Sequence, residues 1–461
     1  MPTRRVPAAP AVIATLILLA LVSVLAPPAR ATGPDDVTQR STITATLDVA
    51  AARLDAVLDL EVTNRSGAPL EHVDLSVVPR ALGFFTLGDP VEVDGHAVEP
   101  AWTTTINLRV PLDGLSPGAV AAITVPFRLD VGLAPDAFRA RTSAANGVFS
   151  FGQWYPIVST EHEVYGVGDP QISYTAASIR LDLTTTAPLP RDAVACPGLV
   201  EAPDETGTHW TCESTDVRDF SFVVNPRFVR TDARAGDVAV RVYTETADGS
   251  GTADLAVRAL TGLAERYGPY PWPDLVLAEV GSAGGFSMEY PRAIHLTRDK
   301  VADPYVVFHE VAHQWFYAQV GNDQQAEPWL DEAWADFSAR DLLGIGEDQC
   351  SSRPVDSDVF AWPADATSGG DWTSCDGYFH AVFYRGTELI TALRDQMGDD
   401  AFFGAMRGWF ARHGGGFVTE GELLGHLQAA TDADLRPTFD AYLAAYELVS
   451  PKPARTLQRG P

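Results

Sequence analysis

Residues 309–337 read HEVAHQWFYAQVGNDQQAEPWLDEAWADF, and they begin with the pattern His-Glu-x-x-His. On a helix, His309 and His313 lie one turn apart on the same face, where two imidazoles can bind one zinc ion. Glu310 lies about 100° around such a helix, from where its carboxylate reaches a metal-bound water without binding the metal. The stretch therefore predicts a zinc site with a general base beside it.

A third ligand follows His313 after 18 residues, at Glu332 in the segment Trp-Leu-Asp-Glu. If this segment opens a second helix, it can place one carboxylate beside the two histidines. Two histidines, one glutamate and a water form the ligand set of a catalytic zinc site. Asp336 lies one turn further along, where it either orients a ligating histidine or faces solvent. We predict about one zinc ion per chain, bound by His309, His313 and Glu332.

The residues around the histidine pair favour a helix. Asp303 can serve as the N-cap by accepting hydrogen bonds from the first unpaired N–H groups, and Pro304 suits the first helical position. Gly321 suits the end of the helix. We therefore expect a helix that begins after Asp303 and ends at Gly321.

Residues 309–337 are similar to the zinc region of the aminopeptidase N family, which has the same spacing of histidines and glutamate. Residues 285–291 (GFSMEYP) resemble the family motif Gly-x-Met-Glu-Asn/Tyr, and residues 217–220 (VRDF) and 267–272 (YGPYPW) are also similar. The similarity extends over about 150–445. It implies an α+β fold, with a β-rich N-terminal domain of antiparallel sheets and a mainly helical, thermolysin-like zinc peptidase domain. It also implies a short form, without the large helical C-terminal domain of longer members.

The resemblance implies an aminopeptidase. In the family, the motif glutamate binds the free α-amino group of the substrate, and the matching residue here is Glu289. Glu310 would take a proton from the zinc-bound water and deliver it to the leaving amine. Ser287 and Tyr290 differ from the usual motif residues, so two alternatives stay open. One is an endopeptidase or other amide hydrolase on the same site, and the other is a noncatalytic interaction protein that keeps the fold.

The oxyanion donor is where the sequence departs from the family. Relatives carry a tyrosine in a Tyr-x-Lys-Gly segment, and the matching residues here are Phe-Tyr-Arg-Gly, with Phe383 at the tyrosine position. We favour Tyr384, because an irregular helix start would turn its phenol inward with the smallest displacement. His380 and Tyr378 are the alternatives, together with a site in which zinc alone stabilises the oxyanion.

The chain before the zinc region has the periodicity of β-structure. Over about 36–232, apolar and polar residues alternate in three segments, at 42–47, 54–62 and 179–183. Alternation with a period of two, bounded by turn residues, predicts antiparallel sheets that have one face toward water.

A polar stretch at 230–237 predicts a domain junction. A strand is expected at 238–242, then a helix with one apolar face that ends at Gly268, and mainly helices beyond it. We therefore predict a β-rich domain at 32–234 and a catalytic domain at 235–448. Residues 449–461 are expected to form a flexible tail.

Residues 1–31 have the pattern of a signal peptide. Two arginines precede an apolar run at 11–26, and a small-x-small cleavage site ends at Ala31. This pattern predicts a secreted, extracellular protein that keeps no membrane anchor after cleavage.

The charge and the cysteines fit export. The net charge is −28, and loss of the three arginines in 1–31 makes it −31 (−28 − 3). So acidic a protein repels nucleic acid and anionic lipid, and the resemblance to aminopeptidase N implies peptide substrates as its partners. An even number of cysteines in an exported chain predicts two disulfides, Cys196–Cys212 and Cys350–Cys375, which close the shortest loops.

Overall fold

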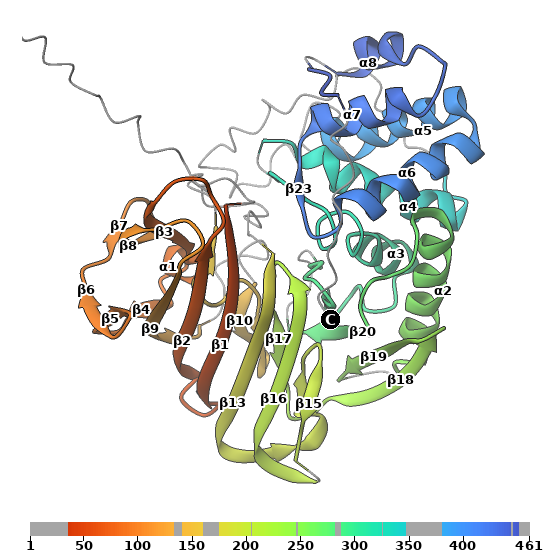
Figure 1. Ribbon diagram of the computed structural model, residues 1–461. Coiled ribbons are helices and arrows are strands. Elements are labelled where there is room, and N and C mark those ends of the chain that lie inside the picture. The colour runs from red at the N-terminus through yellow and green to blue at the C-terminus, as the bar shows by residue number, and fades with distance from the viewer. Residues whose placement is uncertain are drawn as a thin grey trace, which may run out of the picture. The chain divides into compact units, whose positions relative to one another are not determined.

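A long mixed sheet dominates the N-terminal part of the computed structural model (Figure 1). The structure describes residues 36–132, 141–159, 175–203, 205–245, 248–281, 287–324, 326–346, 380–443 and 446–450. In spatial order the strands are β15 (Leu199–Glu201), β16 (Thr206–Val217), β13 (Ala176–Pro190), β1 (Val37–Asp48), β2 (Arg53–Asn64), β9 (Val120–Asp130), β5 (Val91–Val93) and β6 (His96–Val98), with β4 (Phe85–Leu87) also paired to β9.

The predicted alternation is confirmed in this sheet. Ile43, Ala45 and Leu47 of β1 are buried, and the threonines between them are partly or fully exposed. β2 and β13 have the same alternating pattern of burial. Each strand therefore covers the core with one face and meets water with the other. The pairing of β1 with β13 is parallel, and it interrupts an otherwise antiparallel order among the described strands.

Two smaller antiparallel sheets complete the β-rich part. Their strands are β10 (Thr142–Ala145), β11 (Val148–Phe151), β17 (Phe222–Val224) and β14 (Val194–Ala195) in one, and β12 (Ile157–Val158), β3 (Leu70–Ser76), β8 (Asn107–Leu115) and β7 (Ala101–Trp102) in the other. The short helix α1 (Val78–Ala81) follows β3, and the 3₁₀ turn η2 (Arg191–Ala193) precedes β14. Trp154 packs against Phe127, Phe151 and Phe222 in the core between the sheets.

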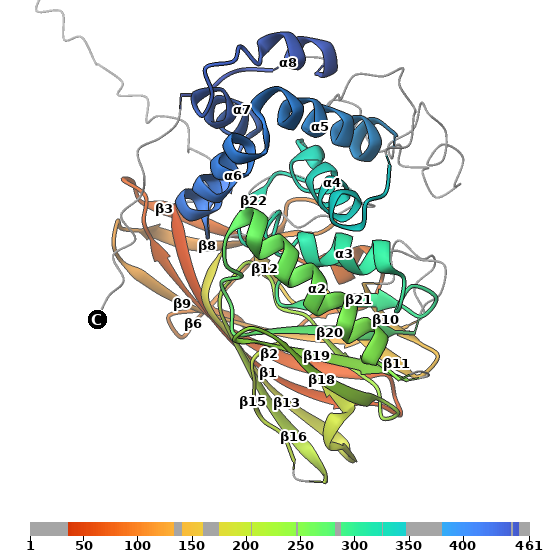
Figure 2. The same cartoon turned by 90° about the vertical axis from the view of Figure 1, so that its right-hand side faces the viewer.

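A further sheet and a helix begin the part that carries the zinc motif. The strands, in order, are β18 (Val229–Ala235), β19 (Val238–Thr244), β20 (Asp274–Val280) and β21 (Ala293–Thr297). Helix α2 (Ser250–Tyr267) packs on β18 and β19 and ends at Gly268, as predicted (Figure 2). Strands β20 and β21 were not predicted. Both are fully buried parallel strands, so neither shows the alternation that reveals a strand.

Helices make up most of the remaining described chain. They are α3 (Pro304–Ala312), α4 (Glu332–Leu343), α5 (Arg385–Met397), α6 (Asp399–His413), α7 (Glu420–Ala429) and α8 (Arg436–Tyr442), with η3 (Pro328–Leu330) before α4 and a π-helical turn η6 (His380–Tyr384) before α5. Of these, α3 and α4 start where the sequence predicts. The side chain of Asp303 accepts hydrogen bonds from the backbone N–H groups of Tyr305 and Val306. A capping box of Thr419 and Glu422 opens α7.

The predicted end of α3 at Gly321 was wrong. The helix ends at Ala312 and His313 is its C-cap. The chain then turns, with Tyr317 at a φ of +102°, and Gly321 begins β22 (Gly321–Asn322), which pairs with β23 (Phe417–Val418). The aromatic residues after His313 are buried, and burying them in a turn outweighs continuing the helix to its glycine.

Arg218, in the VRDF segment, joins the β-rich part to the zinc-bearing part. It is fully buried and donates hydrogen bonds to the backbone oxygens of Ala318 (3.3 Å) and Gly416 (2.9 Å). The described residues from Asp36 onward belong to one compact unit, 32–461. The predicted domain boundaries stay predictions.

Several sequence-based predictions fall outside the described residues. These are the signal peptide, the tail beyond residue 450 and the pair Cys350–Cys375. The predicted Cys196–Cys212 disulfide is present, with a Cα–Cα distance of 6.3 Å. Among the described helices, none is both long and apolar enough to cross a membrane.

Candidate zinc centre

Helices α3 and α4 bring three metal-ligating side chains to one point. The Nε2 atoms of His309 and His313 lie 3.1 Å apart. Oε2 of Glu332 lies 3.2 Å from Nε2 of His309 and 3.3 Å from Nε2 of His313. All three residues are buried, so the described part of the chain holds the predicted ligand set in one cluster.

The spacing of these atoms fits zinc. Ligand atoms at about 2.0–2.1 Å from a tetrahedral zinc ion lie about 3.3 Å from one another. The three separations, 3.1 to 3.3 Å, are close to this value. Two imidazoles and a carboxylate are also the donors that zinc prefers when one position stays open for water.

The His313 imidazole is oriented by the backbone. Its Nδ1 lies 3.2 Å from the carbonyl oxygen of Phe316. A carbonyl can only accept, so Nδ1 carries a proton, and Nε2 is the nitrogen left to bind a metal once its own proton is displaced. The turn that ends α3 after His313 therefore also sets the tautomer of this ligand.

Burial and charge act together on the ligands. Burial opposes protonation of His313, but the Glu332 carboxylate outweighs it and raises the pKa of His313 well above its usual value. Burial likewise works against ionisation of Glu332, but the two histidines hold its pKa well below the usual range. The carboxylate is thus ionised and ready to bind a cation. Asp331 is the N-cap of α4, and its side chain accepts from the Glu332 N–H at 2.7 Å.

Asp336 is fully buried, so the solvent-facing alternative was wrong. Its carboxylate accepts hydrogen bonds from Arg340 Nε at 2.7 Å, Thr387 Oγ1 at 2.8 Å and the Tyr305 hydroxyl. The Tyr305 ring lies 5.9 Å from the His309 imidazole, between centroids. Asp336 therefore accepts from the Tyr305 hydroxyl, and the Tyr305 ring packs beside the His309 imidazole. The sequence did not single out Tyr305, although it lies one helical turn before His309.

Glu310 and Glu289 are both buried near the ligands. Glu310 lies on α3 directly after His309. Glu289 is only 3% exposed, so it is no exposed acid at a strand end, and its charge is one of those that raise the pKa of His313. Residues 282–286 of the motif lie outside the described part of the chain.

Gln314 connects the Glu289 segment to α3. Its side-chain Nε2 donates to the backbone oxygens of Glu289 (3.1 Å) and Tyr290 (3.2 Å), and its Oε1 accepts from the Arg292 N–H (2.8 Å). The sequence did not single out Gln314. The available signal was its place directly after the ligand His313.

Phe383 and Tyr384 end the π-helical turn η6 and have different surroundings. The Phe383 ring stacks on the His309 imidazole, at 5.7 Å between centroids and 11° between planes. The Arg340 guanidinium lies over the Tyr384 ring, 5.1 Å from its centroid. The helix start is irregular, as expected, and it brings Phe383 against the ligand. The role of Tyr384 stays a prediction. Tyr378 lies outside the described residues, and the side chain of His380 is not described.

Comparison with known proteins supports the same class. Residues 254–442 match the Peptidase family M1 domain. Aminopeptidase N of Lactobacillus delbrueckii subsp. lactis is 26% identical over 296 residues, which are 56% of this chain and 34% of the relative. Aminopeptidase N of Lactobacillus helveticus is 26% identical over 160 residues, 30% of this chain and 18% of the relative. The chain thus spans about a third or less of these relatives.

Solved structures share the fold over almost the whole chain. An M1 zinc metallopeptidase of Deinococcus radiodurans superposes with a TM-score of 0.64 at 18% identity, covering 92% of this chain and 97% of that one. A mutant of that organism's enzyme, bound to a Tyr-Ser-Ala substrate, gives 0.65 at 19% identity over 91% and 96%. The predicted fold class, a β-rich domain followed by a mainly helical zinc peptidase domain, is confirmed.

These similarities define the class as a zinc metallopeptidase of the aminopeptidase N type, and the predicted resemblance is confirmed.

Proposed function

We propose that the chain is a zinc aminopeptidase that removes N-terminal residues from peptides. The observation that carries this proposal is the buried Glu289 carboxylate, on a segment hydrogen-bonded to the residue next to the zinc ligand His313. A substrate ammonium needs a fixed anion close to the metal, so that the bond cleaved is always the first one.

Each residue of the proposed site has its own role in the reaction. His309, His313 and Glu332 would hold the zinc, which when bound lowers the pKa of a water and polarises the scissile carbonyl. Glu310 accepts the proton of that water and delivers it to the leaving amine. Glu289 binds the α-ammonium, and Tyr384 is proposed as the hydrogen-bond donor to the oxyanion.

A panel of peptides with free and N-acetylated termini tests this proposal. An aminopeptidase cleaves only the free peptides, whereas an endopeptidase cleaves both kinds and a noncatalytic protein cleaves neither. Glu289→Gln should lower kcat/KM on free peptides by about 10²-fold, because the ammonium loses a charged partner. Glu422→Gln alters another buried glutamate, in the capping box of α7, and should leave the kinetics unchanged.

We also propose that the protein is exported and starts at Thr32 when mature. The Cys196–Cys212 disulfide supports this, because such bonds persist in oxidising compartments. N-terminal sequencing of protein from the culture medium tests it. Protein that stays inside the cell with residues 1–31 attached would contradict it.

A further inference from the structure

We propose that Gln314 is a positioning residue: it fixes the Glu289 turn relative to the zinc-binding histidines and so enforces the requirement for a free α-amino group. This inference rests on the proposed aminopeptidase function and concerns the turn 289–292. The turn carries the ammonium-binding carboxylate, yet its place in the chain is remote from α3.

The Gln314 amide holds both ends of this turn. It donates to the backbone oxygens of Glu289 and Tyr290, and it accepts from the backbone N–H of Arg292. The residue is fully buried, so water does not compete for these bonds. Because Gln314 follows His313 directly, any movement of the turn relative to the ligand breaks at least one of them.

The backbone of Arg292 shows that the turn is held against its own preference. Arg292 has a φ of +62°, a region that residues with a side chain seldom occupy. Such a conformation persists only when the surroundings impose it. The amide of Gln314 imposes it from the side of α3.

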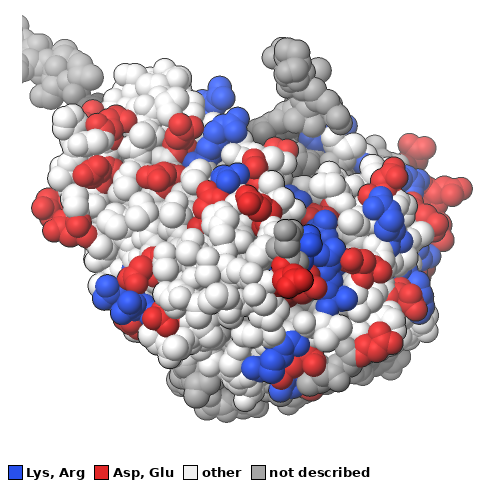
Figure 3. Space-filling view, turned by 90° about the horizontal axis from the view of Figure 1, so that it is seen from below, with Lys and Arg blue, Asp and Glu red and all other residues white. Residues whose placement is uncertain are grey.

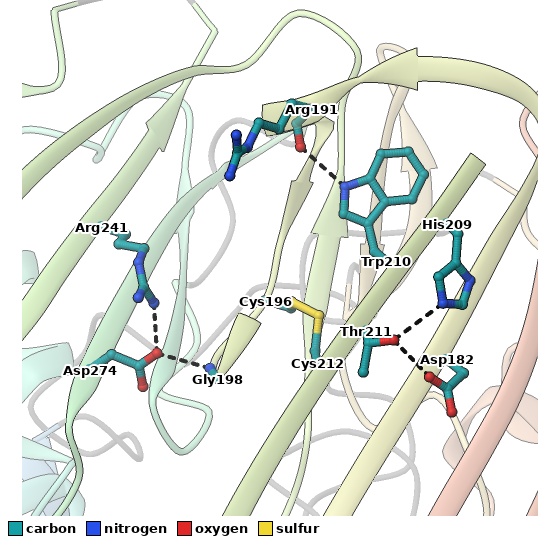
Figure 4. Close-up of a disulfide and its surroundings, with 10 residues drawn as sticks. All are labelled: Asp182, Arg191, Cys196, Gly198, His209, Trp210, Thr211, Cys212, Arg241 and Asp274. Atoms are coloured by element: carbon teal, nitrogen blue, oxygen red, sulfur yellow. Dashed lines mark hydrogen bonds and ion pairs between the residues drawn. A yellow bond between two sulfur atoms is a disulfide. The ribbon is translucent and has the colours of Figure 1, made fainter. Parts of the chain in front are cut away.

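The guanidinium of Arg292 anchors the other side of the turn. Its Nε donates to Oδ1 of Asp274 at 3.0 Å. The second oxygen of Asp274 accepts from Arg241 Nη1 at 2.7 Å and from the Gly198 N–H at 2.9 Å. Figure 4 shows these two partners beside the Cys196–Cys212 disulfide.

Gly198 fits closely against this ion pair. A Cβ there would lie 1.7 Å from the Glu213 oxygen and 3.2 Å from Arg292 Nη2, and its φ is +61°. The disulfide-closed loop therefore supports Asp274 and, through Arg292, the turn. Gln314 and Asp274 therefore bind the same turn on opposite sides, the first through its backbone and the second through the Arg292 side chain.

A matched control separates positioning from general stability. Asn64 is a fully buried amide of β2 that also donates to two backbone oxygens, of Ala68 and Leu115 (both 2.8 Å), and accepts from one N–H, of Ser66 (2.8 Å). The Ser66 hydroxyl also donates to Asn64 Oδ1 (2.7 Å), so Asn64→Leu removes at least as many hydrogen bonds from the β-rich part as Gln314→Met removes from the turn. It should lower Tm and leave kcat and KM unchanged.

The experiment is a double-mutant cycle of Gln314→Met with Glu289→Gln. Each variant is assayed on an aminoacyl anilide and on its N-acetylated form, and Tm and zinc content are measured. We expect Gln314→Met to keep its zinc and to lose about 10–100-fold in kcat/KM on the free substrate, as for a misplaced binding group. On the Glu289→Gln background it should cost less than about 3-fold, since both changes disable one interaction.

Equal losses on both backgrounds would overturn the inference, and so would a loss explained by missing zinc. If Gln314→Met does not fold, Asp274→Asn is used instead, because it weakens the contact of Asp274 with Arg292 of the turn. Its loss of kcat/KM should likewise be smaller on the Glu289→Gln background. If the wild type has a free-amine requirement but the cycle is additive, this inference alone fails. A wild type that cleaves both substrates equally refutes the proposed function itself.

Discussion

Glu310 lies between His309 and His313 in the chain. A substitution there should affect turnover without affecting zinc binding. Glu310→Gln keeps the size of the side chain and removes its basicity. We expect zinc content and Tm to stay near wild type and turnover to fall by about 10²–10⁴-fold, the usual contribution of a general base. His313→Ala is the contrasting variant, because it should lose zinc as well as activity. Near-normal turnover of Glu310→Gln would refute the assigned mechanism.

Tyr384 is the residue whose role depends most on the irregular turn before α5. If its hydroxyl meets the oxyanion, Tyr384→Phe should lower turnover by about 10²–10³-fold and leave zinc binding intact. Phe383→Leu is the companion variant, because it removes the ring stacked on His309 without touching a hydroxyl. A silent Tyr384→Phe would assign the tyrosine a packing role against Arg340. His380 and Tyr378 would then be the next residues to substitute.

Asp219, also in the VRDF segment, makes stability depend on pH. It is buried near Arg141, Tyr155 and Tyr317, and burial raises its pKa from 3.8 to about 7. The folded protein therefore holds a proton that the unfolded chain has released, and stability falls as pH rises from about 4 to about 7.

Asp219→Asn removes this effect. In the wild type, Oδ1 of Asp219 accepts a hydrogen bond from the Phe220 N–H at 2.6 Å, and the asparagine keeps an oxygen that can accept it. The free energy of unfolding of the variant minus that of wild type should increase by about 2–3 kcal/mol from pH 5 to pH 8. Urea unfolding at both pH values measures the gain. A difference that does not change with pH would contradict the shifted pKa.

Helix α3 and its C-cap His313 carry two proposed zinc ligands and the proposed general base, and the start of the helix depends on one side chain. Asp303 accepts from the N–H groups of Tyr305 (3.1 Å) and Val306 (3.4 Å). Asp303→Ala should lower the free energy of unfolding by about 1 kcal/mol, and Asp303→Ser, which keeps a capping oxygen, should lower it much less. Thermal unfolding of the two variants checks the order. Equal losses would mean that the carboxylate acts through Lys300, its ion-pair partner, and not as a cap.

The elements differ in how far the sequence revealed them. Helix starts and amphipathic strands depend on residues adjacent in the chain, so Asp303 and the alternation of β1 were sufficient to predict the start of α3 and the burial pattern of that strand. The end of α3 and the buried strands β20 and β21 depend on burial by distant parts of the chain. Local propensity contains no information about that burial.

At the scale of the whole molecule, the Cys196–Cys212 bond links the residue that follows β14 to strand β16 in the β-rich part. The cysteines are 16 residues apart in the chain, and both are fully buried. Closing a loop of this length should stabilise the protein by about 3 kcal/mol. The double substitution Cys196→Ala with Cys212→Ala should lose about that much in guanidinium unfolding. A peptide map of unreduced protein tests this bond and the predicted Cys350–Cys375 bond together, and free thiols in secreted protein would contradict both.

The chain has a net charge of −28. Figure 3 shows acidic and basic side chains interspersed on one face. Many of these are paired: Arg128 with Asp55 at 2.8 Å and Arg230 with Asp232 at 2.8 Å are two such pairs. Exposed pairs like these contribute little to stability, so we attribute to the charge a role in solubility and not in the fold.

The clustering of the three proposed zinc ligands could be predicted from the sequence because it follows from the pitch of a helix. His309 and His313 must share a face once α3 forms, and a glutamate at the start of the next helix needs only a short connection to join them. The acidic balance and the cysteine pair followed in the same way from counts and spacing.

Other features were decided only by the tertiary structure. Three contacts join residues that are 20 to 80 positions apart in the chain. They are Tyr305 with Asp336, Phe383 with His309, and Gln314 with the Glu289 turn. Each depends on how separate elements pack, and packing follows from the burial of the whole core. A single stretch of sequence specifies its own turns and caps, but the distance between two stretches is set by everything that lies between them.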